Sequence, residues 1–149
     1  MLKRSLYSLF ACALSVSLFV APAGAGTISG GAGLFTQSGN GASSTGGAVF
    51  LSSGRAVPVL PASIDVTGLL PLGSKGGYAL TVEGRAGAAG FYGGAGVGVG
   101  QLGGAKSTGI FTAFVGAKVA PFTSLELRGY TAAGNTGANA ALLGLRFQL

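Results

Sequence analysis

Apolar and polar residues alternate along most of the chain. Near its C-terminal end, Leu143, Leu145 and Phe147 fall on one parity, while Arg146 and Gln148 fall on the other. This period of two is typical of a β-strand with one apolar and one polar face. No segment after residue 25 has a convincing apolar period of 3.6, so helices are not expected there. The alternation predicts eight strands, at residues 27–37, 46–53, 62–70, 77–85, 90–101, 109–119, 123–131 and 137–149.

The connections between the predicted strands also follow a pattern. Segments 38–45, 73–76, 102–108 and 132–136 are rich in Gly, Ser and other small residues, which is typical of loops. A weak repeat links PASIDVTG, which begins at Pro61, to PFTSLELRG, which begins at Pro121. The second copy comes four predicted strands after the first, so the two strands should run in the same direction. Even strand spacing of this kind favours an up-and-down meander.

Charged residues lie on the polar faces of the strands. The three acids of the whole chain, Asp65, Glu83 and Glu126, all fall within predicted strands. In an exported soluble β-protein, this polar face would be solvated and the apolar faces would form a dry core. The many Ala, Val and Leu residues on the other face would then make a secreted monomer poorly soluble. The pattern therefore favours the inverted arrangement, with apolar residues facing lipid and charged residues facing inward.

The first 25 residues have the organisation of a secretory signal peptide. Lys3 and Arg4 precede an apolar stretch at residues 9–20, and Ala23-Gly24-Ala25 is a small-residue cleavage motif. The apolar stretch is short for a transmembrane helix, which must cross a core of about 30 Å. We therefore assign residues 1–25 to the signal and residues 26–149 to one domain. Cys12 is the only cysteine, so this domain has no thiol for disulfides, catalysis or zinc binding.

Composition argues against several classes of function. The bases after residue 25 are scattered singly, whereas nucleic-acid binding usually requires a clustered basic patch. The chain has no histidine, and its three acids have basic neighbours that disfavour a general base. The glycine-rich segment 94–98 lacks the following helix that a dinucleotide site needs. We therefore expect no enzyme activity, no catalytic residue, no cofactor, no metal site and no nucleic-acid partner.

The signal peptide, the eight alternating segments and the C-terminal LLGLRFQL together resemble the small eight-stranded outer-membrane β-barrels of Gram-negative-type bacteria. This class includes the OmpA membrane domain and OmpX. The resemblance implies an all-β fold, an eight-stranded antiparallel up-and-down transmembrane β-barrel, exported by the signal peptide to the outer membrane. It also implies contact with membrane lipid, a monomeric state, and recognition by the barrel assembly machinery. Members usually end in an aromatic residue, whereas this chain ends in Leu149; the implied assembly signal is Leu143, Leu145, Phe147 and Leu149.

Barrel closure would pair the last strand with the first, so that no strand edge is left exposed in lipid. An eight-stranded barrel is just wide enough for side chains to fill its interior. We expect Gly94, Gly96, Gly98 and Gly100 to face inward and to leave room for a salt-bridged network. Buried charges are tolerated when they are paired; the predicted members are Asp65, Glu83, Arg85, Lys118, Glu126, Arg128 and Arg146.

Three functions are consistent with these predictions. The first is a structural or interaction barrel with a largely plugged lumen and short surface loops. The second is a narrow anion-preferring channel or small-ligand barrel, lined by Arg85, Lys118, Arg128 and Arg146. The third is an exported soluble β-protein.

Overall fold

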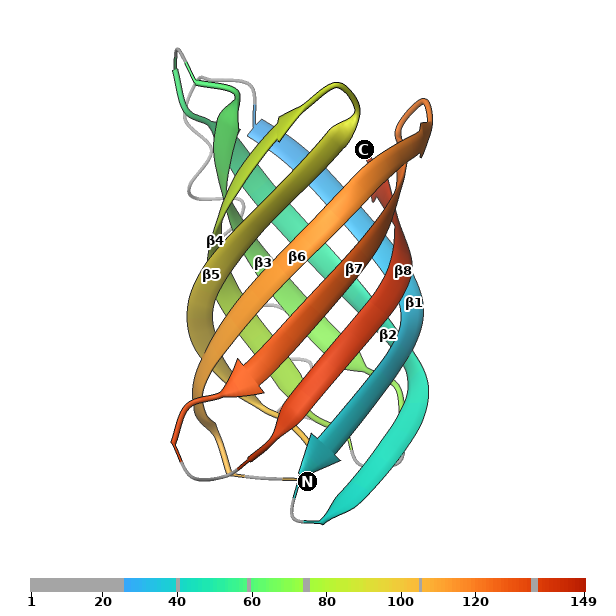
Figure 1. Cartoon of the computed structure of the whole chain (residues 1–149), viewed down its shortest axis with the longest axis vertical. Helices are drawn as coiled ribbons and strands as arrows, with labels where there is room; N and C mark the ends of the chain where they lie inside the picture. The colour runs from blue at the N-terminus through green and yellow to red at the C-terminus, as the bar shows by residue number, and fades with distance from the viewer. Residues whose placement is uncertain (1–25, 40, 59, 74–75, 105, 135–136) are drawn as a thin grey trace.

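The computed structural model describes residues 26–39, 41–58, 60–73, 76–104, 106–134 and 137–149. These residues form a closed antiparallel barrel in which β8 pairs with β1 (Figure 1). Its strands are β1 (Gly26–Gly39), β2 (Ala42–Ala56), β3 (Ala62–Pro71), β4 (Tyr78–Ala88), β5 (Phe91–Gln101), β6 (Thr108–Ala120), β7 (Thr123–Ala132) and β8 (Asn139–Gln148). The predicted all-β, up-and-down fold is confirmed. Within the described ranges, no helix is long and apolar enough to cross a membrane.

The two ends of the barrel differ. At the end drawn uppermost in Figure 1 lie the connections β2–β3, β4–β5 and β6–β7, together with the last residues of β8. We call this the turn end, because Ala89-Gly90 and Pro121-Phe122 are two-residue turns. Ala89, Gly90 and Phe122 have positive φ, as tight hairpins commonly require. The opposite end, which carries the other connections, is called the loop end.

The first hairpin is longer than the sequence predicts. Residues 38–45 were expected to form a loop, but Ser38 pairs with Ser43 and Gly39 with Ala42. The loop assignment was therefore wrong. Ser and Thr are compatible with a strand, and the Thr36 and Thr45 hydroxyl oxygens lie 3.1 Å apart across the pair. The predicted signal peptide, residues 1–25, lies outside the described residues.

Apolar side chains cover the outside of the barrel. Val82 on β4, Phe111 on β6 and Leu127 on β7 are each more than half exposed, at 52%, 57% and 51%. The intervening residues on the same strands, such as Glu83, Thr112 and Glu126, are buried. The alternative of a dry core formed by the apolar faces is therefore wrong. An eight-stranded barrel has too narrow an interior to hold every large apolar side chain of its strands.

The interior itself has two layers. Near the loop end it is apolar, whereas the polar and charged residues lie toward the middle and the turn end. Only the charged layer was predicted from the sequence, and the apolar layer was not. The apolar layer consists of Phe35, Ala48, Phe50, Leu69, Ala79, Leu102, Ile110, Tyr130, Ala132, Ala138, Ala140 and Leu142.

A buried ion-pair network and a cavity at the turn end

Arg128 on β7 lies at the centre of the charged layer. Its side chain is fully buried, and its Nη1 and Nη2 donate to the two carboxylate oxygens of Glu83 at 2.7 and 2.9 Å. The Nε of Arg128 donates to Glu126, two residues along the same strand. Because Glu83 comes from β4, this fork joins two strands that are not neighbours in the barrel. Bidentate pairs of this kind are strong and fix orientation.

Hydroxyl groups complete the shell around Glu83. Thr67 on β3 donates to Oε2 at 3.0 Å, and Thr81 on β4 donates to Oε1 at 2.6 Å. Ser52 on β2 lies 2.7 Å from the Thr67 hydroxyl and extends the chain of hydrogen bonds. A buried carboxylate is costly unless it is paired and hydrogen-bonded, and Glu83 meets both conditions.

Glu126 connects this centre to the turn end. Besides Arg128, its carboxylate accepts hydrogen bonds from Tyr92 on β5 at 2.8 Å and from Arg146 on β8 at 3.1 Å. A nitrogen of Arg85 on β4 lies 3.9 Å away. Glu126 is completely buried. It therefore links three arginines that come from different strands.

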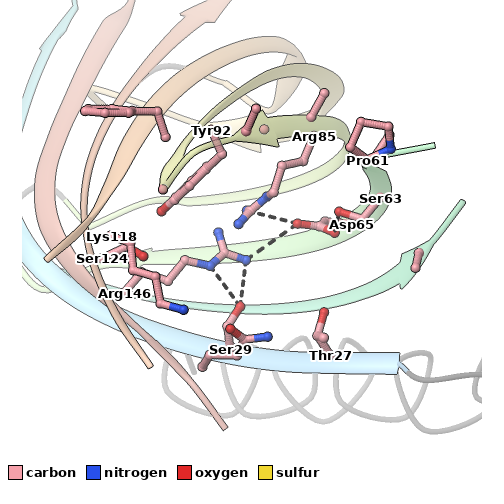
Figure 2. A pocket seen from close by; sticks show the side chains of 18 of the residues that line it. Thr27, Ser29, Pro61, Ser63, Asp65, Arg85, Tyr92, Lys118, Ser124 and Arg146 are labelled. Carbon is pink, nitrogen blue, oxygen red and sulfur yellow. Dashed lines mark hydrogen bonds and ion pairs between the residues drawn. The ribbon is translucent and has the colours of Figure 1, made fainter. Parts of the chain in front are cut away.

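Asp65 on β3 is the third acid of the network, and Figure 2 shows it beside Arg85. Its Oδ2 lies 2.9 Å from Arg85 and 3.6 Å from Arg146, and its Oδ1 accepts a hydrogen bond from Ser63 at 2.8 Å. Arg146 also donates from Nε and Nη2 to the hydroxyl of Ser29 on β1, at 2.9 and 2.6 Å. Asp65 and Ser29 therefore hold Arg146 from two sides.

Aromatic rings lie against the guanidinium groups. Arg85 lies over the rings of Tyr92 and Phe114, at 4.7 and 5.0 Å from the ring centres. Arg128 lies 4.5 Å from the centre of Phe114 and 5.5 Å from that of Phe50. Cation–π contacts stabilise a desolvated guanidinium and limit its rotation. The rings therefore hold the arginines in place in addition to the ion pairs.

The structure brings together six of the seven residues predicted for the network. These six are three arginines and three acids, so the charges balance. Lys118 differs from the prediction: it is exposed and makes no ion pair with a described residue. It lies near the end of β6, where the register with β7 shifts, and so lies beyond the paired layer.

Several members of the network were missed by the sequence analysis. Tyr92 shares its parity with the inward glycines of β5, so the alternation would have placed it inside. Ser29 and Thr67 are neutral, and only their parity distinguishes them from other hydroxyl residues. Charge alone therefore does not identify these hydrogen-bonding partners.

The network holds its acids in fixed pairs. Each of the three carboxylates has an arginine nitrogen within ion-pair distance. Among the described residues, no three His, Cys, Asp or Glu are grouped so that they could hold a metal ion. The arrangement suits structural cross-linking of the strands better than proton transfer.

A cavity of about 610 Å³ opens beside this network at the turn end (Figure 2). Its charged lining is Asp65, Arg85, Lys118 and Arg146, which come from β3, β4, β6 and β8. Its mouth includes turn residues such as Pro61, Gly90 and Phe122. The predicted site residue Lys118 therefore belongs to the wall of the cavity.

The residues of the predicted assembly signal lie on the outer surface of β8 and just after it. Leu143, Leu145 and Phe147 are exposed by 48%, 42% and 45%, and Leu149 follows the end of the strand. The outward residues of β8 therefore form one apolar column, on the face of the strand opposite to Arg146.

Comparison with known proteins shows similarity of structure. No family model and no curated protein sequence matches the chain. The crystal structure of Neisserial surface protein A matches with a TM-score of 0.59 and 16% identity, over 83% of this chain and 97% of that one. Ail, the attachment invasion locus protein of Yersinia pestis, solved with the heparin analogue sucrose octasulfate, matches with a TM-score of 0.53 and 12% identity, over 83% and 97%. A de novo designed transmembrane β-barrel matches with a TM-score of 0.51 and 12% identity, over 83% and 95%.

At these identities the similarity concerns the fold alone. Each match covers nearly the whole of the other chain. This chain therefore has the fold of the small eight-stranded outer-membrane β-barrels.

Proposed function

We propose that this chain is a structural, non-conducting barrel of the outer membrane of a Gram-negative-type bacterium, exported by the signal peptide at residues 1–25. The observation that carries the proposal is the combination of an apolar exterior with an interior that is filled from the loop end to the Arg128 network. Its role would be to occupy the membrane and to display short connections at the loop end. The proposal assigns no enzymatic activity to it.

The arrangement of the ends supports one orientation in the membrane. Outer-membrane barrels have short turns on the periplasmic side and longer loops outside. The two-residue turns at Ala89-Gly90 and Pro121-Phe122 would then face the periplasm. The loop end would face the outside of the cell.

Contacts at the loop end support a closed lumen. Leu102, from the β5–β6 connection, is only 1% exposed and packs in the apolar layer. The amide of Gln37 donates to the Gly76 carbonyl at 3.2 Å and accepts from the Gly103 N–H at 2.9 Å. Gln37 therefore ties two loop-end connections to the barrel wall. Below them, the Arg128 network fills the next part of the lumen.

Electrical recording distinguishes this proposal from a narrow anion channel. We expect the full-length protein, inserted in planar lipid bilayers, to give no conductance steps above the bare membrane. The protein is delivered to the bilayer from lipid vesicles, and its folded state is checked by its heat-dependent migration on SDS gels after recovery from these vesicles. Reproducible anion-selective steps would contradict the plugged lumen and favour the channel.

The proposed partners follow from the outer surface. Lipid would contact the apolar band, and the barrel assembly machinery would recognise Leu143, Leu145, Phe147 and Leu149, which are all exposed. No nucleic acid is proposed as a partner, and the barrel would act as a monomer.

A further inference from the structure

The cavity at the turn end has no role in the proposed structural function. It is closed on its inner side by Tyr92 and Arg146, behind which Glu126 and Arg128 are completely buried. Its lining includes turn residues on the other side, such as Pro61, Gly90 and Phe122, so it opens toward the turn end. Its volume of about 610 Å³ lies within the usual range for small-molecule sites.

The lining is cationic. Arg85, Lys118 and Arg146 contribute three positive charges, and Asp65 contributes the only negative side chain among the described residues that line the cavity. Asp65 is already paired with both arginines. Lys118 has no ion-pair partner among the described residues, although its side chain lies on the same wall as Arg146 and Ser124 (Figure 2). Because Glu126 and Asp65 both pair with Arg85 and Arg146, the positive charge in excess here is that of Lys118.

Arg85 carries unused hydrogen-bonding capacity. Its Nε is buried and has no partner among the described residues, whereas its Nη2 lies 2.9 Å from Oδ2 of Asp65. The ion pairs with Asp65 and Glu126 and the rings of Tyr92 and Phe114 hold the guanidinium in place. Buried donors without partners are rare in native proteins and often mark the position of a bound ion or water. The guanidinium is thus fixed beside the cavity with its Nε donor still available.

We infer that the turn-end cavity binds the phosphate group of a small phosphate monoester, between Arg85, Arg146 and Lys118. Donor groups on three different strands, two guanidinium groups and one ammonium, suit the several oxygens of a phosphate better than a single carboxylate. The rest of the cavity has room for the organic part, beside apolar residues such as Phe91, Phe122 and Leu60. The inference does not depend on whether the barrel conducts.

Titration calorimetry on the full-length protein, folded in a nonionic detergent, tests this inference. One probe is glycerol 3-phosphate, which represents a soluble ligand. The other is dihexanoyl phosphatidic acid, kept below its critical micelle concentration, which represents a lipid headgroup. We expect saturable one-to-one binding of at least one probe, and the probe that binds more tightly identifies the source. If neither binds, the inference is wrong.

Variants locate the site. Arg85→Gln should weaken binding at least about tenfold, because a charge-assisted hydrogen bond is lost. Lys118→Gln should weaken it about threefold, as expected for an exposed charge. Lys118 is exposed and outside the ion-pair network, so its variant should fold even where the Arg85 variant does not.

Lys106→Gln is the matched control. Lys106 is also an exposed lysine, but it lies in the β5–β6 connection at the loop end. Lys106→Gln changes the net charge of the protein as much as Lys118→Gln does. It should leave the affinity for the probe unchanged. An equal loss of affinity in Lys106→Gln and Lys118→Gln would show non-specific attraction to a basic protein and would overturn the inference.

Discussion

At the scale of single residues, the interior depends on complete pairing of buried charge. Arg128, Glu83 and Glu126 are each exposed by no more than 1%, so none of them is solvated by bulk water. A buried ion pair contributes little net stability compared with well-packed apolar residues, but removal of one partner leaves an uncompensated charge. The network therefore affects the stability of the barrel most when one of its members is removed.

Glu126→Ala tests this dependence. The substitution removes the acceptor for Arg128, Arg146 and Tyr92 together. We expect the free energy of unfolding to fall by about 3 kcal/mol or more. The midpoint of urea unfolding in detergent measures the change. An unchanged midpoint would count against a tightly coupled network, and Ser124→Ala, on the same face of β7, serves as the control.

Much of the network could be predicted from parity, because charged residues in alternating strands share the inward face. Lys118 was misplaced because parity does not show where a strand leaves the paired region or where its register shifts. The fork between Arg128 and Glu83 crosses the lumen between β7 and β4, and no local pattern encodes that contact. Tyr92 carries no charge, so only its inward parity on β5 indicates that it belongs to the network.

At the scale of the strand, the glycines of β5 have a second role. They were expected to leave room for arginine side chains. A Cβ built on Gly94, Gly96 or Gly98 would also lie against a backbone carbonyl of β4, that of Gly84, Val82 or Leu80 respectively. These glycines therefore allow β5 to coil closely against β4. Outward Gly84 has no atom within 4 Å of such a Cβ.

Two glycine substitutions separate these roles. Gly98→Ala should destabilise the barrel by about 1–3 kcal/mol, because backbone has to move to admit the methyl group. Gly84→Ala should leave the stability of the barrel unchanged or raise it by about 0.5 kcal/mol, because alanine reduces the conformational freedom of the unfolded chain. Urea unfolding of both variants in the same detergent gives the comparison. Equal effects would contradict a close approach of β5 to β4.

The outward face of β7 provides a test of lipid exposure. Leu127 lies near the middle of the strand, whereas Thr131 lies near the loop end, and both are exposed. Leu127→Arg should cost about 2–4 kcal/mol in lipid vesicles, and Thr131→Arg about 0–1 kcal/mol. If Leu127→Arg left the free energy of unfolding unchanged, this face would not contact lipid.

The two copies of the repeat, which begin at Pro61 and Pro121, take opposite positions in the barrel. The two copies form β3 and β7, which are four strands apart in a closed barrel of eight. They bring Asp65 and Glu126 to the network from opposite walls. Each acid then lies within ion-pair distance of both Arg85 and Arg146.

At the scale of the whole molecule, alternation predicted the number of strands, even spacing predicted their order, and the resemblance to outer-membrane barrels implied closure. The layering of the interior could not be predicted in this way. Inward residues such as Phe35 and Leu142 are apolar, and so are the residues on the outer face. Residue type alone therefore does not distinguish the two faces near the loop end. Closure decides which apolar residues become the inner layer at the loop end.

The central claim is that the chain folds into a closed barrel with its apolar surface in the membrane and its charges inside. The most direct test is migration on SDS gels, with and without boiling, of the full-length protein recovered from the membrane fraction. We expect the unboiled protein to migrate at a different position from the boiled protein, because a closed barrel resists SDS until it is heated. Identical migration, with the protein recovered in the soluble fraction without detergent, would contradict the account.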